Sequence, residues 1–245
     1  PEDFRRFGKP RLGFLITSGN VDSMVNHYSV FKRRRRTDAY SPGGKTGRRP
    51  DRAVIVYSQR AREAYKDVPI ILGGLEASLR RHAHYDYWED RIRRSILLDS
   101  KADLLVYGMG ERAVVEIAEA LDGGIDVKHI SWIPGTVYRK TVSMEELDAE
   151  FPGQAPVLLP SFEEVSRSKK AYADSFKIQY RNKDPVNGKI LVEPYGNNNV
   201  VVTNPPMPPL ESLDLDDICE LPYERNWHPM YKAEGGVPAI EEVKF

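Results

Sequence analysis

Short apolar runs alternate with amphipathic stretches through the first half of the chain. The apolar runs cover residues 12–16, 68–72, 103–107 and 129–133. Each run is followed by turn residues, mainly glycine, as at the ends of buried strands. Strands that are apolar throughout and are separated by helices predict an α/β fold, in which helices cover both faces of a parallel sheet. The stretches with helical spacing predict helices at 51–66, 85–98 and 111–121.

The pattern changes near residue 150, where prolines mark a connection. A polar helix is predicted at 161–180, and it begins with a capping box formed by Ser161 and Glu164. Two apolar runs follow, at 189–193 and 200–203, around a group of turn-forming residues. This arrangement predicts a hairpin.

The C-terminal part combines a stiff connector with a further strand pattern. Residues 204–209 are rich in proline, which suits an extended spacer laid across another surface. Residues 237–245 have the pattern of a strand that is just beginning, and we predict a strand there.

Charge and cysteine content exclude several classes of function. Lysine plus arginine and aspartate plus glutamate both total 36, so the net charge predicts no general affinity for nucleic acid or anionic membranes. No run of about 18 apolar residues occurs, so no membrane span is predicted. Cys219 is the only cysteine, and one thiol cannot hold an iron–sulfur cluster. With no span and no visible signal peptide, we expect a cytoplasmic protein.

The segment Gly43-Gly44-Lys45-Thr46 partly matches a phosphate-binding P-loop. The motif requires a further glycine at the position of Ala39. It also requires a preceding strand, and a run of arginines stands there instead. A P-loop is therefore rejected.

A second glycine motif lies between a predicted strand and a predicted helix. Gly108, Gly110 and Ala113 fit the loose dinucleotide fingerprint, which leaves a nucleotide-binding Rossmann domain as an alternative. Glu111 places a carboxylate where a pyrophosphate would bind, and like charges there oppose the ligand. The glycines are also explained by tight packing of the predicted strand against the predicted helix, with no bound nucleotide.

His82, His84 and Asp86 resemble a cluster of metal ligands. Side chains two residues apart point the same way only on a strand, and this stretch reads as the start of a helix. We therefore expect no metal site and interpret the cluster as a surface or interface patch.

A basic belt lies in the first long loop and has aromatic residues among its cations. It could contact phosphate or RNA, with Tyr28, Phe31 and Tyr40 available for base stacking, which leaves an RNA- or phosphate-binding module as the second alternative. A solvated loop neutralised by acidic neighbours is the other interpretation. The belt comprises Lys32, Arg33, Arg34, Arg35, Arg36, Lys45, Arg48, Arg49 and Arg52.

Several long segments resemble one known family. Residues 68–81, 83–88 and 101–112 are similar to the YgiQ-type family of radical SAM proteins. The segment 71–78 and the Gly-x-Gly-Glu turn at 108–111 are also similar to the cobalamin-binding type of domain that precedes many radical SAM barrels. Shorter segments agree with the family in the same order, at 18–26, 40–44, 55–59, 204–206 and 221–223.

The resemblance implies three parts. Residues 1–145 would form a Rossmann-like, cobalamin-binding-like α/β domain that lacks its first β-α unit. Residues 146–236 would supply the helix, the hairpin and the connector. Residues 237–245 would be the opening strand of a truncated radical SAM barrel.

The resemblance also implies a [4Fe–4S] cluster and S-adenosylmethionine for the intact protein, held by a C-x3-C-x2-C motif beyond this chain. We therefore expect an accessory domain without cofactors, catalytically incompetent by itself. Its partner would be the radical SAM barrel of the same polypeptide. Cobalamin is not predicted, because no Asp-x-His-x-x-Gly loop occurs, and the resemblance supplies no substrate.

Ligands of open parallel sheets bind beyond the carboxyl ends of the strands. The loops after the first three predicted strands should therefore form the ligand-facing side. Their glycines would allow close backbone approach, and Asn20, Asp22, Glu76 and Glu111 would supply polar contacts. The candidate residues are Ser18, Gly19, Asn20, Asp22, Gly73, Gly74, Glu76, Gly108, Gly110 and Glu111.

Overall fold

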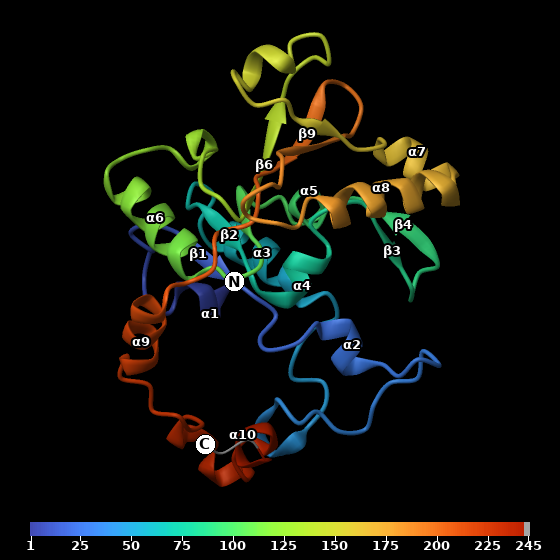
Figure 1. The fold of residues 1–245 in the computed structure, drawn as a ribbon. Helices are drawn as coiled ribbons and strands as arrows, with labels where there is room; N and C mark the ends of the chain where they lie inside the picture. The colour runs from blue at the N-terminus through green and yellow to red at the C-terminus, as the bar shows by residue number, and fades with distance from the viewer. Residues whose placement is uncertain (243–245) are drawn as a thin grey trace.

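Seven strands form one sheet at the centre of the molecule (Figure 1). The computed structural model describes residues 1–242, with Asp148 described by its backbone alone. The strand order is β1-β2-β5-β6-β9-β8-β7, and β3 and β4 form a separate hairpin. The strands are β1 (Phe14–Ile16), β2 (Ile70–Leu72), β3 (His84–Asp86), β4 (Arg91–Arg93), β5 (Leu104–Val106), β6 (Thr136–Thr141), β7 (Val157–Leu158), β8 (Leu191–Pro194) and β9 (Asn199–Thr203).

The sheet is mixed, although its first strands are parallel as predicted. β1 pairs with β2 and β2 with β5 in parallel, whereas β6 is antiparallel to both β5 and β9. Two reversals of direction make β9 run the same way as β5. The predicted α/β, Rossmann-like class is confirmed, but the sheet is not parallel throughout.

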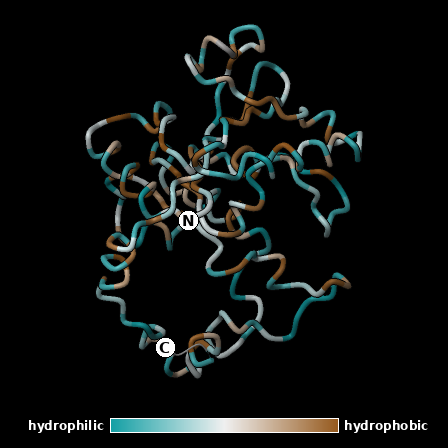
Figure 2. Tube along the Cα trace, in the orientation of Figure 1, coloured by the Kyte–Doolittle hydropathy of each residue, from teal (hydrophilic) through white to brown (hydrophobic). Residues whose placement is uncertain are grey.

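Helices cover both faces of the sheet. Neighbouring strand residues alternate between the two cores, with Leu104 in one and Leu105 in the other. Burying each such side chain stabilises the fold by about 2 kcal/mol. Figure 2 shows these apolar stretches concentrated in the central strands. The helices are α1 (Glu2–Arg5), α2 (Ser23–His27), α3 (Ala53–Ala64), α4 (Gly74–Leu79), α5 (Ile96–Ser100), α6 (Glu111–Asp122), α7 (Phe162–Arg167), α8 (Lys169–Arg181), α9 (Ser212–Glu220) and α10 (Pro238–Glu242), with short 3-10 turns η1 (Pro42–Gly44), η2 (Val127–His129), η3 (Asp148–Glu150) and η4 (Pro229–Glu234).

The layers follow from these contacts. α3, α4 and α5 pack on one face together with Val137 and Val201. α6 packs on the other face with Ile130 and Ile133. None of the described helices has the length and apolar character needed to cross a membrane.

The hairpin predicted in the second half is confirmed, and it belongs to the central sheet. β8 pairs with β9, and β9 pairs with β6 across five residue positions, from Val137–Thr203 to Thr141–Asn199. Strands from both sides of residue 145 therefore share one sheet. The predicted helix at 161–180 is two helices, α7 and α8, separated at Ser168, and the capping box of Ser161 and Glu164 is present at its start.

Two predictions in the middle of the chain are wrong. The helix expected at 85–98 is the β3–β4 hairpin followed by the short helix α5. Asp90 forms its turn with a positive φ of 54°. The strand expected at 129–133 is a 3-10 turn and a loop, and the strand begins only at Thr136.

The C-terminal segment also differs from the prediction. Residues 238–242 form α10, so the strand predicted at 237–245 is wrong for them, and 243–245 lie outside the described residues. The segment returns to the first long loop, because Gly43 N donates to Gly236 O at 2.7 Å and Ala239 N donates to Ala39 O at 2.9 Å. Figure 1 shows the resulting ring of chain below the sheet.

Candidate functional site

The carboxyl ends of β1, β2 and β5 lie side by side, as the parallel order requires. The first two strand-end loops are joined, since Gly73 N donates to Ile16 O at 2.9 Å. A Cβ at Gly74 would lie 3.2 Å from the Cβ of Thr17, and the φ of Gly74 is +78°. Glycine is therefore required where these two loops touch.

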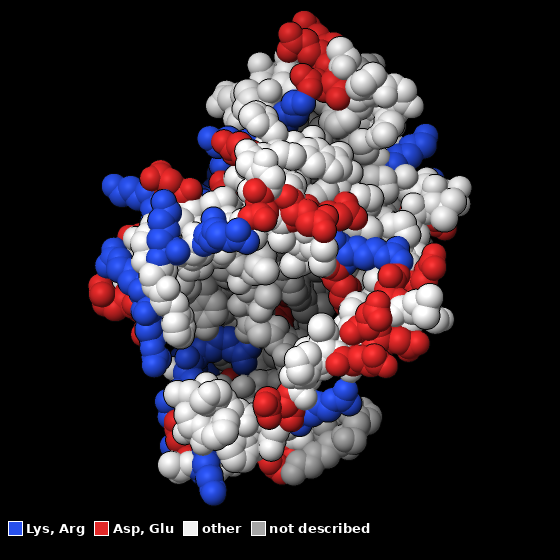
Figure 3. All heavy atoms as spheres, turned by 90° about the vertical axis from the view of Figure 1, so that its left-hand side faces the viewer, with Lys and Arg blue, Asp and Glu red and all other residues white. Residues whose placement is uncertain are grey.

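The C-terminal segment leaves the sheet at the same edge. Asn204 ends β9 beside this edge, and its carbonyl accepts the hydroxyl of Tyr107, the residue after β5, at 2.6 Å. α9 is held to α6 by an ion pair between Arg112 and Asp214. Figure 3 shows a hollow between the α/β body and the part below it, where the first long loop meets the C-terminal segment. Lys and Arg side chains gather at one side of this hollow. The strand-end loops and the C-terminal segment thus border an open recess.

Glu76 is a structural residue at this edge. Its carboxylate is 1% exposed and accepts hydrogen bonds from Ser23 N at 2.8 Å and Val54 N at 3.1 Å. Both amides belong to first turns of helices, α2 and α3, where backbone N–H groups have no partner within the helix. Glu76 therefore joins three helices and has no oxygen left for a ligand.

Asp22 and Ser18 are likewise engaged in holding the loops. Asp22 caps α2 by accepting from Met24 N and Val25 N, and it forms an ion pair with Arg80. The carbonyl of Ser18 accepts from Arg49 at 2.6 Å. These two predicted contacts serve the protein's own backbone.

The remaining candidates stay open. Gly19, Asn20, Gly74, Gly108 and Glu111 are exposed, and Gly73 and Gly110 are half-buried. A Cβ at Gly108 would meet nothing within 4 Å.

Gly110 caps the start of α6. A Cβ there would lie 3.0 Å from a methyl group of Val106, so this glycine allows the helix to pack against its strand. Glu111, exposed at the start of α6, places negative charge where a pyrophosphate would bind. A nucleotide-binding Rossmann site is thus not supported.

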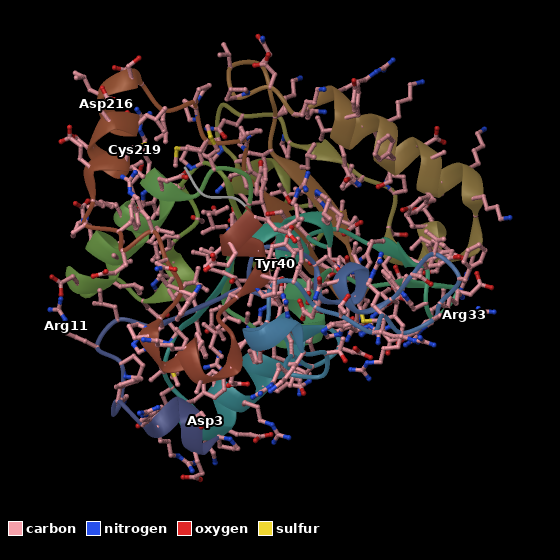
Figure 4. All side chains as sticks on the ribbon, turned by 90° about the horizontal axis from the view of Figure 1, so that it is seen from below. Asp3, Arg11, Arg33, Tyr40, Asp216 and Cys219 are labelled. Atoms are coloured by element: carbon pink, nitrogen blue, oxygen red, sulfur yellow. The ribbon has the colours of Figure 1, made fainter. Side chains whose placement is uncertain are left out.

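About half of the basic belt is paired inside the protein. Arg49 pairs with the buried Asp38, and Arg52 pairs with Asp86 and Glu89. Lys45 and Arg48 both reach Glu234 of the C-terminal segment. The arginines from 33 to 36 are exposed, and Figure 4 shows Arg33 pointing away from the body. Four of the nine belt residues are thus paired within the protein, and the RNA-binding alternative is not supported.

The rejected P-loop glycines have a different role. Gly43 has a φ of +63°, and a Cβ on it would lie 2.4 Å from the carbonyl oxygen of Glu234. The C-terminal segment can approach the first long loop only because no side chain stands there. Sequence reasoning missed this contact, which joins residues far apart in the chain.

His82 and Asp86 of the histidine cluster are buried, so its interpretation as a surface patch is wrong, and its role at an interface stays a prediction. His82 is 3% exposed and His84 is half-buried at the start of β3. Asp86 is buried as well and pairs with Arg52. The described residues contain no group of three or more His, Cys, Asp or Glu side chains placed to hold a metal ion.

Glu193 lies beneath this cluster and was not singled out by its sequence. It is 0% exposed, accepts from Ala83 N at 3.0 Å and accepts the hydroxyl of Tyr195 at 2.6 Å. Burial raises its pKa to about 7, and the hydrogen bonds from Tyr195 and Ala83 partly oppose that rise. A glutamate that interrupts an apolar strand was the available signal.

Cys219 lies on α9 and is exposed, with Asp216 on the same helix (Figure 4). Within the described part of the chain, Cys219 belongs to no group of three or more His, Cys, Asp or Glu side chains placed to hold a metal ion. A single thiol does not fit the three ligands of an iron–sulfur cluster.

A cavity of about 690 Å³ lies at the opposite edge of the sheet, near the start of β5. Its half-buried Asp103 is occupied, because it accepts from Arg62 at 2.7 Å and from Ile70 N at 2.9 Å. This cavity therefore offers no free buried charge of its own.

The chain belongs to the family described as Radical SAM N-terminal, and the match covers residues 1–245. No solved structure matches it.

Its relatives are longer proteins of the UPF0313 group. One, from Clostridium botulinum strain 657 (type Ba4), is 54% identical over 245 residues, which are all of this chain and 37% of the relative. Another, from Clostridium perfringens strain 13 (type A), is 54% identical over 244 residues and is covered to 36%. The chain thus spans a little over a third of the length of these relatives.

Proposed function

We propose that this chain is the N-terminal accessory domain of a radical SAM enzyme of the YgiQ type. In this proposal, the strand-end recess forms one wall of the active site, and a radical SAM barrel of the same polypeptide forms the other. The single observation that carries the proposal is the family match over the whole chain, combined with relatives that are much longer. The loops at 17–20 and 108–111 would face the reacting molecule.

The division of labour follows from the residues present. S-adenosylmethionine and a [4Fe–4S] cluster would supply the radical chemistry. With Cys219 as its only cysteine, this chain cannot provide the cluster's three thiolates. Its own residues would bind and orient the substrate and exclude water. The substrate's identity is not part of the proposal.

The proposed three parts are the α/β domain at 1–145, the helix, hairpin and connector at 146–236, and the entry to the barrel from 237. The shared sheet supports treating the first two as one body, because β6 and β9 pair across the boundary. The segment from 237 would lead into the barrel as a helix, not as a strand.

The test uses the full-length protein with its cluster reconstituted without oxygen. Hydrogen exchange followed by mass spectrometry is compared with and without S-adenosylmethionine and the cluster. We expect slower exchange in the loops 17–20, 73–76 and 108–111, and no change in the loop at Gly123 and Gly124, at the other end of α6. Equal exchange in all loops would reject the proposal, as would a full-length sequence without a cysteine triplet.

A further inference from the structure

A second cavity lies away from the strand-end recess, between α8 and the segment that links α4 to β3. Its volume is about 340 Å³, within the lower range of small-molecule sites, which begins near about 300 Å³. One wall is the segment 79–84, and the other is a single face of α8. The lining contains no acidic side chain.

Arg81 is a half-buried cation in this wall without an anionic partner. Its Nε has no hydrogen-bond partner, and no carboxylate forms an ion pair with it within the described chain. Its guanidinium lies 4.7 Å from the ring centroid of Tyr107 and donates to Ser78 O. Burial lowers the pKa of Arg81.

His82 adds a donor that is also unsatisfied, whereas the N–H of His84 already donates from Nδ1 to His82 O at 3.0 Å. Neither ring nitrogen of His82 has a partner among the described residues, and Nε2 of His84 has none. The nearest carboxylate oxygen to His82, on Glu193, is 3.9 Å from its Nδ1, beyond hydrogen-bond distance. Burial lowers the pKa of both rings, that of His84 to about 4, so each is neutral near pH 7 and carries one N–H. Unsatisfied buried donors cost free energy that an acceptor on a ligand would recover.

The α8 side of the cavity is aromatic. Tyr172, Phe176 and Tyr180 lie on one helical face, at spacings of four residues, and Phe176 is 63% exposed. Lys183 adds a second cation, with its Nζ 4.0 Å from the ring centroid of Tyr180. Flat apolar rings beside cations and N–H donors complement a flat apolar molecule that carries negative charge.

We propose that this cavity binds a small aromatic anion, that is, a ring bearing a phosphate or carboxylate group. The ring would stack on the α8 aromatics, and the anionic group would accept from Arg81 and His82. A rotation of the His82 imidazole about its broad χ2 would turn its N–H towards the ligand. This proposal does not rest on the proposed function.

The experiment measures binding to the full-length protein by calorimetry. The probes are phenyl phosphate and benzoate, with benzyl alcohol as the uncharged analogue and inorganic phosphate as the anion without a ring. We expect at least one aromatic anion to bind about tenfold more tightly than either control probe. Hydrogen exchange should slow in segments 79–84 and 172–183 on binding. The preferred anionic group separates phosphate from carboxylate ligands.

Variants locate the binding. Phe176→Ala and Lys183→Gln alter exposed side chains that line the cavity, and each should weaken binding about fivefold to tenfold. Lys170→Gln is the matched control, because Lys170 is exposed on α8 and does not line the cavity. Arg81→Met should abolish measurable binding, and its melting temperature shows whether it folds.

Three results would overturn the proposal. Benzyl alcohol binding as tightly as the anions would mean that charge has no part. Equal effects of Lys183→Gln and Lys170→Gln would reveal a general charge effect. Binding that neither Phe176→Ala nor Lys183→Gln weakens would place the ligand elsewhere in the protein.

Discussion

Arg80 and Arg81 are neighbours in the chain, yet they belong to two regions that differ in whether buried charges are paired. Arg80 pairs with Asp22 at the strand-end edge, where Glu76 and Ser18 are also fully engaged. Arg81 lies in the wall of the α8 cavity with no carboxylate partner among the described residues, beside two histidines with unsatisfied nitrogens. Satisfied buried groups fix the shape of a protein, whereas unsatisfied ones indicate a missing partner. The strand-end polar residues that the sequence suggested as ligand contacts are therefore mainly structural.

The largest expected effect follows from removing the central carboxylate of the strand-end region. Glu76→Ala leaves the backbone N–H groups of Ser23 and Val54 without acceptors and should lower the free energy of unfolding by about 4 kcal/mol. Urea unfolding measures the change. Glu63→Ala is the control, because the exposed Glu63 side chain pairs with Arg60 and with no other described residue, and it should shift stability by less than about 0.5 kcal/mol. Equal losses in the two variants would contradict the structural role.

The neighbouring arginines provide the most direct test of the comparison. Arg80→Met leaves Asp22 as a buried carboxylate without a cation and should cost about 3 kcal/mol. Arg81→Met removes an uncompensated charge and retains apolar bulk, so its effect should stay within about 1 kcal/mol of zero. Urea unfolding of both variants gives the two values. A larger loss in Arg81→Met than in Arg80→Met would reverse the comparison.

Glu193 should make stability depend on pH. Because burial raises its folded pKa from 4.5 to about 7, its full contribution is present below pH 4.5 and is lost as the pH rises through 7. The stability of the wild type relative to Glu193→Gln should therefore fall by about 2 to 3 kcal/mol between those pH values. His82 and His84 contribute the opposite slope, since their lowered pKa values favour the neutral form, but both proteins share it. A constant difference across this range would show that Glu193 ionises normally.

The smallest effect is expected where the C-terminal segment contacts the first long loop and closes the ring of chain below the sheet. Gly43→Ala should strain the positive φ and push against Glu234 O, with a loss of about 1 kcal/mol or less of global stability. Its clearest sign should be faster hydrogen exchange at Gly236 and Ala239. Gly47→Ala is the matched control, because Gly47 also has a positive φ but open space around it. Exchange that speeds up equally in both variants would mean that contact with Glu234 is unimportant.

The local sequence pattern correctly predicted the strands with continuous apolar runs and the helices with a long amphipathic pattern. β1, β2, β5 and α6 lie close to their predicted ranges, because continuous apolar runs and a helix with a well-defined apolar face leave little choice. The stretch at 85–98 has a helical appearance but forms a hairpin, since Asp86 is drawn inward to pair with Arg52. That contact spans 34 residues and is invisible to any local pattern.

The candidate site shows the same limit. The exposed glycine loops were predicted correctly in position, because parallel strands bring their ends together. What Glu76 does could not be predicted, since its partners lie 53 and 22 residues away. The α8 cavity could not be predicted either, because it depends on the antiparallel return of β9 and β8, which places α8 opposite His82.

The hydrogen bonds from Ala83 to Glu193 connect positions 110 residues apart. A growing polypeptide can pair β1, β2 and β5 long before residue 193 is synthesised. Until then, Ala83 N in the segment after His82 lacks its acceptor on Glu193. Synthesis of β8 therefore completes this part of the fold. The Glu193 carboxylate then joins the early and late halves of the chain.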